Sequence, residues 1–334
     1  MSKSFPEPKP APPGRQRAQA WTSYWASGVL HSCAGSFAGN YGAPYREFWR
    51  EVFAGLAAGA KVLDLCCGNA PLSKMLLEER GDLRGLVHLE AVDAAEVAPA
   101  WVRALPPGQR EMVRVHPGTD AAALPFPDAC LDLCMSQFGI EYAGLQAWRE
   151  AARVLRSGGE LAAVLHHVDA LPVQIAHEEL EHLDWLERPD GLLPMTEAMI
   201  EPVARSADPA AAPALRADAA ANASRRAFNA CQEALRRRAA SASHPDVLHE
   251  VGQASFVVLQ TARAGGLAAG RAAMANLREE LSRTRLRQRE LVDAALDEAA
   301  LRGLCACVGS TEPELQVLRF DGNRIAGWAI RIRR

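Results

Sequence analysis

Residues 62–73 read VLDLCCGNAPLS, and this stretch decides the fold. A β-branched and leucine run carries Asp64, a tight turn follows through Gly68, and a helix opens with Pro71 in its first turn. A strand that turns directly into a helix leaves backbone N–H groups pointing at a ligand. The stretch therefore predicts an α/β sheet that binds a ligand across its strand ends.

The turn does not fit a dinucleotide. A pyrophosphate-binding turn has the pattern G-x-G-x-x-G, and here the three positions hold Cys66, Gly68 and Pro71. A nicotinamide-dependent oxidoreductase is therefore not expected.

Short apolar runs alternate with helical ones beyond this stretch, which indicates a parallel sheet covered on both faces. The expected strands are 61–65, 85–93, 112–116, 131–137 and 160–167, with a helix over about 144–156 before the last of them. The chain ends with a helix over 289–304 and two further runs, 314–320 and 325–332, on either side of Asp321-Gly322-Asn323. Asp-Gly between apolar runs indicates an antiparallel hairpin. The expected fold class is α/β, with seven strands, a C-terminal antiparallel hairpin and a helical insertion.

The insertion is expected over 169–285, where the strand signal stops. Residues 169–201 carry nine acids against one base, and 205–238 carry seven arginines against three acids. Both stretches are rich in alanine, with the apolar spacing of helices. Only 254–260, ASFVVLQ, reads as either a strand or a buried helix.

The N-terminal region divides in two. Residues 1–16 read as a disordered tail, and 17–57 as an aromatic segment with three of the seven tryptophans and three of the four tyrosines. This segment is expected either to form a lid over the ligand or to pack onto the sheet as a hydrophobic staple.

Composition excludes several classes of protein. The 334 residues are 49% hydrophobic with a net charge of −3, so the chain can bury a core and has no overall basic field for nucleic acid. No apolar run is long enough for a bilayer or a signal peptide, and eight cysteines are too sparse for a disulfide framework. His177-Glu178-x-x-Glu181 lacks the second histidine of a zinc helix, so no metal is expected. The expected location is the cytoplasm.

The stretch 62–73 resembles motif I of the class I S-adenosylmethionine-dependent methyltransferases, commonly VLDLGCGxG, with Cys66 and Ala70 in place of two glycines. Residues 118–137, GTDAAALPFPDACLDLCMSQ, resemble the family's GDAExLPFPDxSFDLV segment. Residues 149–164, REAARVLRSGGELAAV, resemble the helix–Gly-Gly–strand unit of the type 11 subgroup, which includes the ubiquinone and menaquinone methyltransferases.

The resemblance implies a Rossmann-like core over 58–168 and 286–334. It also implies an enzyme that uses S-adenosylmethionine and moves a methyl group by direct SN2 transfer. The insertion over 169–285 follows the fifth strand, beside the strand ends, and is expected to cap the acceptor. Such a large cap favours a bulky, partly apolar small molecule that takes the methyl group on oxygen or carbon. Two alternatives remain: a methyltransferase acting on RNA or protein, and a non-catalytic scaffold that keeps the fold and either binds the cofactor or has lost it.

The resemblance also assigns site residues. Asp93 is expected to bind the ribose hydroxyls, with Glu90 as the alternative, and Asp120 to contact adenine. The expected cofactor-binding set is Asp64, Cys66, Gly68, Asn69, Asp93, Asp120, Ala121, Ser136, Gln137, Trp25 and Tyr41.

Two histidines, His166 and His167, end the fifth strand on the rim where the acceptor is expected. Either is a candidate general base, because imidazole titrates near neutrality, and either could instead only pack or hydrogen-bond. Gln137, Glu141 and Tyr142 follow the fourth strand and could line the acceptor pocket. The expected partner is a small molecule, neither a membrane nor a nucleic acid, and the oligomeric state is left open.

Overall fold

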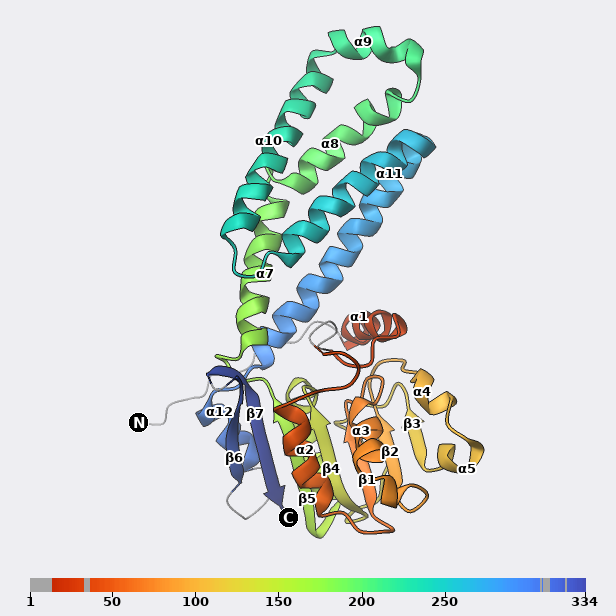
Figure 1. Ribbon diagram of the computed structural model, residues 1–334, viewed down its shortest axis with the longest axis vertical. Helices are drawn as coiled ribbons and strands as arrows, with labels where there is room; N and C mark the ends of the chain where they lie inside the picture. Colours follow the sequence, from red (N-terminus) through yellow and green to blue (C-terminus); the bar gives the residue numbers. More distant parts are fainter. Residues whose placement is uncertain (1–13, 33–36, 307, 309–312, 322) are drawn as a thin grey trace. The chain divides into compact units, whose positions relative to one another are not determined.

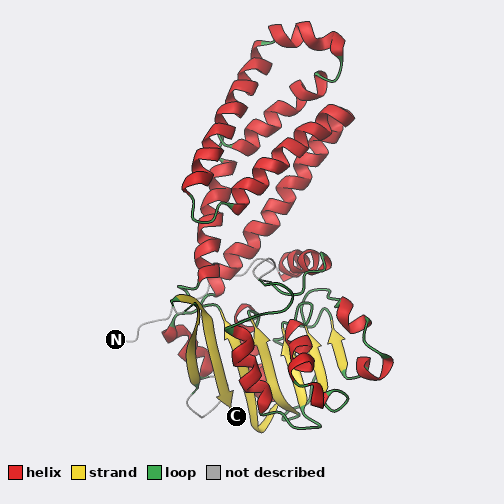
Figure 2. Ribbon diagram, viewed as in Figure 1, coloured by secondary structure: helices red, strands yellow, loops and turns green. Residues whose placement is uncertain are grey.

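The computed structural model describes residues 14–32, 37–306, 308, 313–321 and 323–334 (Figure 1). The chain divides into two compact units, Met1–Val173 with Asp293–Arg334, and Gln174–Val292. The first unit holds the sheet and the second consists of helices (Figure 2).

The sheet has seven strands in the order β3-β2-β1-β4-β5-β7-β6. They are β1 (Lys61–Leu65), β2 (His88–Val92), β3 (Val113–His116), β4 (Leu131–Gln137), β5 (Leu155–Leu165), β6 (Glu314–Phe320) and β7 (Arg324–Arg333). Strands β1 to β5 pair in parallel, and β7 pairs antiparallel with β5 and β6. The expected α/β fold with a C-terminal antiparallel hairpin is confirmed. The strand order reverses between β1 and β4, which is where open α/β sheets bind their ligands.

Alternate residues of the central strands bury opposite faces of the sheet. On one face, Val62, Met135 and Val164 pack with helices α2 (Tyr45–Ala54) and α3 (Pro71–Glu79). On the other, Leu63, Cys134 and Leu165 pack with α6 (Gly144–Val154) and α12 (Glu298–Cys305). The parallel sheet therefore lies between two helical layers, as its continuous apolar strands predict.

Strand β5 begins earlier than expected. The predicted helix ran to residue 156, but α6 ends at Val154 and Leu155 already pairs with Leu131 of β4. Gly159 permits the close pairing, because a Cβ atom there would lie 3.1 Å from the carbonyl oxygen of Leu131. Sheet pairing thus overrides the helical pattern at this end.

The helix expected over 289–304 is broken. Helix α11 ends at Ala294 and α12 begins at Glu298. Between them, the Leu296 N–H donates to the His166 carbonyl oxygen, and the Asp297 carboxylate accepts from the Ala300 N–H at 2.7 Å. A strand-end contact and a helix cap outweigh continuous helical propensity here.

The helical unit contains no strand among its described residues, and 254–260 is helical. Its elements are α7 (Leu171–Glu187), α8 (Leu192–Arg205), η3 (Pro209–Ala211), α9 (Ala212–Ala217), α10 (Ala219–Ser241) and α11 (Asp246–Ala294). Helix α11 is interrupted at Gly266, which has φ of 81°. Ala262 and Gly270 are in contact across this residue, so the chain doubles back (Figure 1).

The remaining described elements belong to the sheet-containing unit. They are α1 (Gly14–Ala26), η1 (Gly81–Leu83), α4 (Ala100–Arg103), α5 (Pro107–Arg110) and η2 (Ile140–Tyr142). Helix α1 begins at Gly14, inside the range 1–16 that the sequence predicts as a tail, and 1–13 lie outside the described residues. In the part of the chain that the structure describes, no helix has the length and apolarity needed to span a membrane.

We expect Gly270→Ala to destabilise the helical unit. A Cβ atom at Gly270 would lie 2.5 Å from Ala262 Cβ and 2.7 Å from Ile200 Cγ2, so the variant is expected to lose about 1–3 kcal/mol. The matched control is Gly303→Ala on α12, where a Cβ atom meets nothing within 4 Å, and a gain of about 0.5 kcal/mol is expected. Chemical denaturation followed by circular dichroism measures both, and equal effects would contradict the close packing.

Candidate functional site

The turn after β1 has an unusual backbone. Cys66, Gly68 and Ala70 all have positive φ, at 54°, 53° and 55°. Left-handed backbone costs a residue with a side chain roughly 1–2 kcal/mol, so Cys66 and Ala70 hold strain where the resembling family has glycine. Local strain of this kind persists only where surrounding contacts maintain it, and here they come from β2 and from α1.

Asp93 follows β2 and holds this turn. One carboxylate oxygen accepts from the Gly68 N–H at 2.7 Å, and the other accepts from the Ala95 N–H at 2.8 Å. Burial raises the pKa of Asp93, and the two N–H donors and the positive charge of Arg17 oppose that shift. Each oxygen keeps a further lone pair, so the carboxylate can still accept from a pair of ligand hydroxyls.

Glu90 lies elsewhere. Its carboxylate is 2.6 Å from Nε2 of His116 on β3. Asp93, rather than Glu90, therefore adjoins the turn.

Asp64 supports the turn from below. It is 2% exposed, and one oxygen accepts from both the N–H and the hydroxyl of Ser73 in the first turn of α3, the latter at 2.8 Å. These bonds join β1 to the helix that follows it. Asp64 thus contributes to the wall of the site.

Helix α1 lies over the same turn. A Cβ atom at Gly68 would be 2.5 Å from the Trp25 ring, so only glycine permits this contact. The Asn69 side-chain amide donates to the carbonyl oxygens of Trp25, at 3.0 Å, and Val29, at 2.7 Å. Trp101 donates through its indole nitrogen to the Asn69 carbonyl oxygen at 2.9 Å. Trp25, Gly68 and Asn69 are therefore brought together.

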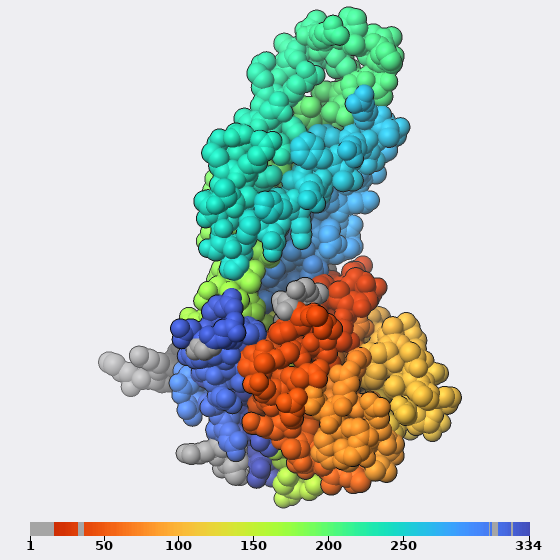
Figure 3. All heavy atoms as spheres, viewed as in Figure 1, coloured from red at the N-terminus to blue at the C-terminus, as the bar shows by residue number. Residues whose placement is uncertain are grey.

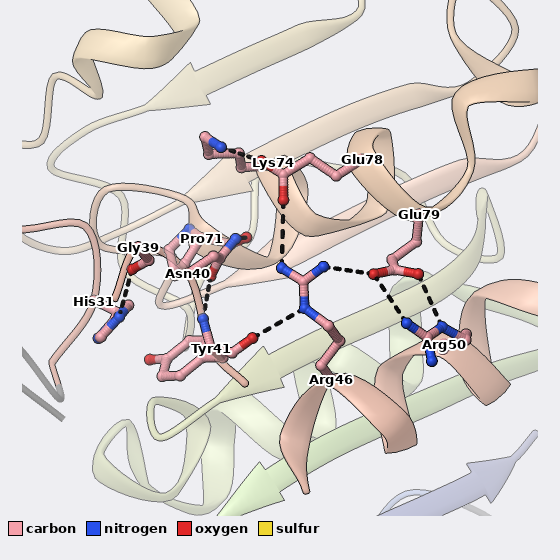
Figure 4. A network of polar contacts seen from close by, with 10 residues as sticks. All are labelled: His31, Gly39, Asn40, Tyr41, Arg46, Arg50, Pro71, Lys74, Glu78 and Glu79. Atoms are coloured by element: carbon pink, nitrogen blue, oxygen red, sulfur yellow. Dashed lines mark hydrogen bonds and ion pairs between the residues drawn. The ribbon is translucent and has the colours of Figure 1, made fainter. Parts of the chain in front are cut away.

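Tyr41 belongs to the segment that joins α1 to α2. It is buried and its ring stacks on His31 at 4.4 Å. Figure 4 shows how this segment is tied to α3: Arg46 donates to the Tyr41 carbonyl oxygen at 3.2 Å and to Glu79 at 2.7 Å, and Arg50 also donates to Glu79. Tyr41 packs within the core on this face of the sheet, beside Phe138. Helices α1 and α2 form part of the visible surface of the sheet-containing unit (red to orange in Figure 3).

Ser136 and Gln137 close β4. The Ser136 hydroxyl donates to the Leu65 carbonyl oxygen at 2.9 Å and accepts from the Ile140 N–H at 3.0 Å, which joins the ends of β4 and β1. The Gln137 side-chain oxygen accepts from Trp49 at 2.5 Å. Its amide nitrogen is buried without a hydrogen-bond partner among the described residues, which leaves a donor for a ligand.

The loop after β3 lies beside Asp93. The Thr119 N–H donates to the Asp93 carbonyl oxygen at 2.8 Å. Asp120 is exposed and accepts from the Ala122 N–H at 2.9 Å, whereas Ala121 is buried. The loop therefore presents one acid to solvent and one small apolar side chain to the interior.

The two histidines after β5 have different surroundings. His166 is buried, and its Nδ1 lies 2.9 Å from a carboxylate oxygen of Glu141. His167 stacks on Trp328 at 4.6 Å, and its Nδ1 accepts from the Asp169 N–H at 2.9 Å. Burial lowers the pKa of His167.

Two contacts of the site were not foreseen from the sequence. The Arg17 guanidinium lies 5.7 Å over the Tyr142 ring and interacts electrostatically with Asp93. Trp101 anchors Asn69 from α4. Arginine is so frequent in this chain that no signal marks Arg17, and nothing around Trp101 in the sequence marks it as a donor to the turn.

Gly68→Ala is expected to displace Trp25 from the turn, because the added Cβ atom clashes with the indole. The intrinsic tryptophan emission should shift to longer wavelength, and α1 should become more sensitive to limited proteolysis. Gly28→Ala is the matched control, since it places alanine at a φ of 84° with nothing within 4 Å. Similar emission from both variants would contradict the contact.

Asp64 gives the folding stability a defined pH dependence. Burial raises its pKa from 3.8 to about 7. Between these values the folded protein retains a proton that the unfolded chain has released, so the free energy of unfolding falls as pH rises from about 4 to about 7.

Asp64→Asn is expected to gain roughly 4 kcal/mol over the parent protein across this window, since the pKa of Asp64 rises from 3.8 to about 7 and each pKa unit is worth about 1.4 kcal/mol. Urea unfolding at both ends of the window measures the gain. Ser73→Ala should have the opposite effect, because the serine hydroxyl lowers the pKa of Asp64. If the difference in free energy of unfolding between Asp64→Asn and the parent is the same at both pH values, the pKa of Asp64 is not raised.

Comparison with known proteins agrees with this geometry. Residues 63–163 match the type 11 methyltransferase domain family. A demethylmenaquinone methyltransferase of Listeria welshimeri is 35% identical over 112 residues, which are 32% of this chain and 44% of that protein. A ubiquinone/menaquinone biosynthesis C-methyltransferase of Xylella fastidiosa is 32% identical over 120 residues, which are 34% of this chain and 46% of that protein.

Among solved structures, geranyl diphosphate C-methyltransferase from Streptomyces coelicolor is similar to 47% of this chain, over 67% of its own length, with 18% identity and a TM-score of 0.34. The chain matches less than half the length of the two curated relatives. Residues 63–163 thus match a methyltransferase domain and are similar to part of the demethylmenaquinone and ubiquinone/menaquinone methyltransferases.

Proposed function

We propose that this protein is a cytoplasmic S-adenosylmethionine-dependent methyltransferase that transfers a methyl group to oxygen or carbon of a bulky, partly apolar small molecule. The observation that carries the proposal is the bond between Asp93 and the Gly68 N–H, within a domain of the methyltransferase family. It puts a carboxylate with spare lone pairs beside a strained turn at the point where the strand order reverses.

The residues around this turn fit the cofactor. Asp93 would accept hydrogen bonds from the ribose diol, and Gly68 and Asn69 would line the turn. The loop with Asp120 and Ala121 would lie at the adenine, because its backbone is bonded to that of Asp93. When bound, S-adenosylmethionine supplies a methyl group already activated by a sulfonium, so the protein contributes mainly alignment and exclusion of water.

The remaining members of the predicted set have supporting roles. Asp64 and Ser136 would hold the turn through Ser73 and Leu65. Cys66 would shape it, and Gln137 would offer its amide N–H group, which has no partner among the described residues. Trp25 and Tyr41 would close the site, and aromatic faces suit a sulfonium because its positive charge is attracted to the π-system.

Aromatic side chains support an apolar acceptor. Phe138 and Tyr142 both contact the His166 ring, with centroids at 4.3 and 5.7 Å, and Trp21 packs edge-on to Tyr142 at 6.2 Å. The relatives named above act on a demethylmenaquinone and in ubiquinone/menaquinone biosynthesis, which are consistent with an acceptor of this class. His166 is preferred over His167 as the general base, since His167 is occupied by Trp328 and Asp169.

The alternative of an RNA or protein acceptor draws on the arginine-rich helices. Two arginines of α11 are already paired: Arg285 with Asp184 and Glu187, and Arg278 with Glu197. These charges neutralise acids of the same unit, which favours the small-molecule acceptor. The expectation that 169–285 cap the acceptor stays a prediction.

Calorimetric titration tests the cofactor. We expect micromolar affinity for S-adenosylmethionine and S-adenosylhomocysteine, and a loss of at least tenfold in Asp93→Asn, because one carboxylate oxygen becomes an amide. Glu90→Gln is the matched control, and its affinity should equal that of the parent protein. If Glu90→Gln loses affinity while Asp93→Asn binds as the parent does, the ribose contact belongs to Glu90. If the parent protein does not bind the cofactor, the non-catalytic scaffold is favoured.

A further inference from the structure

A buried carboxylate beside the site, Glu141, is not among the residues assigned to the cofactor. Glu141 lies in η2, just after β4, with a fully buried side chain. One oxygen accepts from the His166 backbone N–H at 3.1 Å and lies 2.9 Å from His166 Nδ1. The other is buried with no hydrogen-bond partner among the described residues. Burying a carboxylate costs free energy that a purely structural pair would avoid with apolar side chains.

The pair defines the state of the imidazole. A carboxylate only accepts hydrogen bonds, so the 2.9 Å contact with Glu141 favours the tautomer of His166 that carries the hydrogen on Nδ1. The lone pair of the neutral ring is then on Nε2. Phe138 covers the ring at 4.3 Å and Tyr142 lies edge-on at 5.7 Å, so the ring orientation is held by packing as well as by the hydrogen bond.

The pair lies at the same edge of the sheet as the turn after β1. A Cβ atom at Gly139 would lie 2.6 Å from Cys66 Cβ, so the segment that carries Glu141 touches the turn. Burial raises the pKa of the Cys66 thiol, and the charges of Asp93 and Glu141 raise it further. The carboxylate–imidazole pair and the cofactor turn are therefore neighbours within one unit.

Other polar groups among the described residues also lie around His166. The Tyr142 hydroxyl, from η2, lies 3.5 Å from His166 Nδ1, and Arg17, from α1, stands over the Tyr142 ring. Cys66 faces the pair from the turn. His167 is the chain neighbour and is occupied by Trp328 and by Asp169. Glu141 is thus the acid in direct contact with the His166 ring.

We propose that Glu141 is a positioning residue that makes His166 a proton acceptor, and that the acceptor molecule reacts through a weakly acidic hydroxyl, phenolic or enolic. The inference rests on the proposed function. His166 Nε2 accepts the hydroxyl proton. At the same time an electron pair of the hydroxyl oxygen, or of the carbon conjugated to it, forms the bond to the methyl carbon. The carbon–sulfur bond breaks and its electron pair remains on sulfur, giving S-adenosylhomocysteine. The Glu141 carboxylate stabilises the imidazolium that results.

The arrangement argues against acceptors without a proton to lose. A thioether or a tertiary amine attacks the methyl group directly and needs no base. A buried acid that orients an imidazole serves no purpose with such nucleophiles. A neutral phenol or enol is a weak nucleophile until its proton is removed, and general bases accelerate such steps about 10²–10⁴-fold.

Two phenols of different acidity test the proposal. 1-Naphthol is largely un-ionised at neutral pH, whereas 4-nitrophenol is substantially ionised and needs little help from a base. Methyl transfer from S-adenosylmethionine to each is measured by mass spectrometry between pH 6 and 9. The proteins are the parent chain of 334 residues, Glu141→Gln, Glu141→Asp and the control Asp169→Asn, which changes a 73% exposed side chain beside His167.

We expect Glu141→Gln to lower kcat on 1-naphthol about 10²–10³-fold and on 4-nitrophenol less than about tenfold. The affinity of Glu141→Gln for S-adenosylmethionine, measured by calorimetry, should equal that of the parent. Glu141→Asp should recover part of the lost kcat. The difference in kcat between Glu141→Gln and the parent should become smaller at high pH. Asp169→Asn should behave as the parent. Equal losses on both phenols would mean a structural role and would overturn the proposal, as would no loss on either.

The same experiment separates the two levels of inference. Cofactor binding by the parent protein without transfer to either phenol would overturn the acceptor class while leaving a methyltransferase. Absence of cofactor binding would overturn the proposed function itself.

Discussion

A carboxylate at the end of one strand holds the backbone of the turn that follows the neighbouring strand. Asp93 accepts a hydrogen bond from the Gly68 N–H at 2.7 Å. The turn can then keep every second residue, Cys66, Gly68 and Ala70, in the left-handed backbone conformation. Without this bond, the strain at Cys66 and Ala70 would be relieved by opening the turn. The position of α3, the docking of Trp25 and the placing of Asn69 all depend on its closed shape.

Three carboxylates, Asp64, Asp93 and Glu141, are buried in and around this turn. Burial penalises their charged forms, and each is compensated by donors from the chain: N–H groups, a serine hydroxyl or an imidazole. Apolar side chains would fill the same space at lower cost to stability. Polar groups retained against such a cost are typical of sites that bind or react, which agrees with a methyltransferase domain in this part of the chain.

Much of the fold follows from local pattern. The strand runs, the turn after β1 and the helical insertion are all visible as periodicity and turn chemistry. The differences lie where tertiary contacts outweigh propensity: β5 extends back to Leu155 because Gly159 allows close pairing, and the last helix breaks at Leu296, which bonds to His166. The reversal at Gly266 has only a Gly-Gly pair as its signal, inside a continuous helical pattern.

For the site, the sequence alone determined which residue types stand at the strand ends, because a strand that enters a Gly-containing turn exposes its last residues at the sheet edge. It favoured Asp93 with Glu90 as the alternative, and it left His166 and His167 as equal candidates. Only the tertiary structure decided that Asp93 adjoins the turn and that His166 meets Glu141. The reason is physical: successive residues point to opposite sides, and the partners that they meet come from strands and helices far away in the chain.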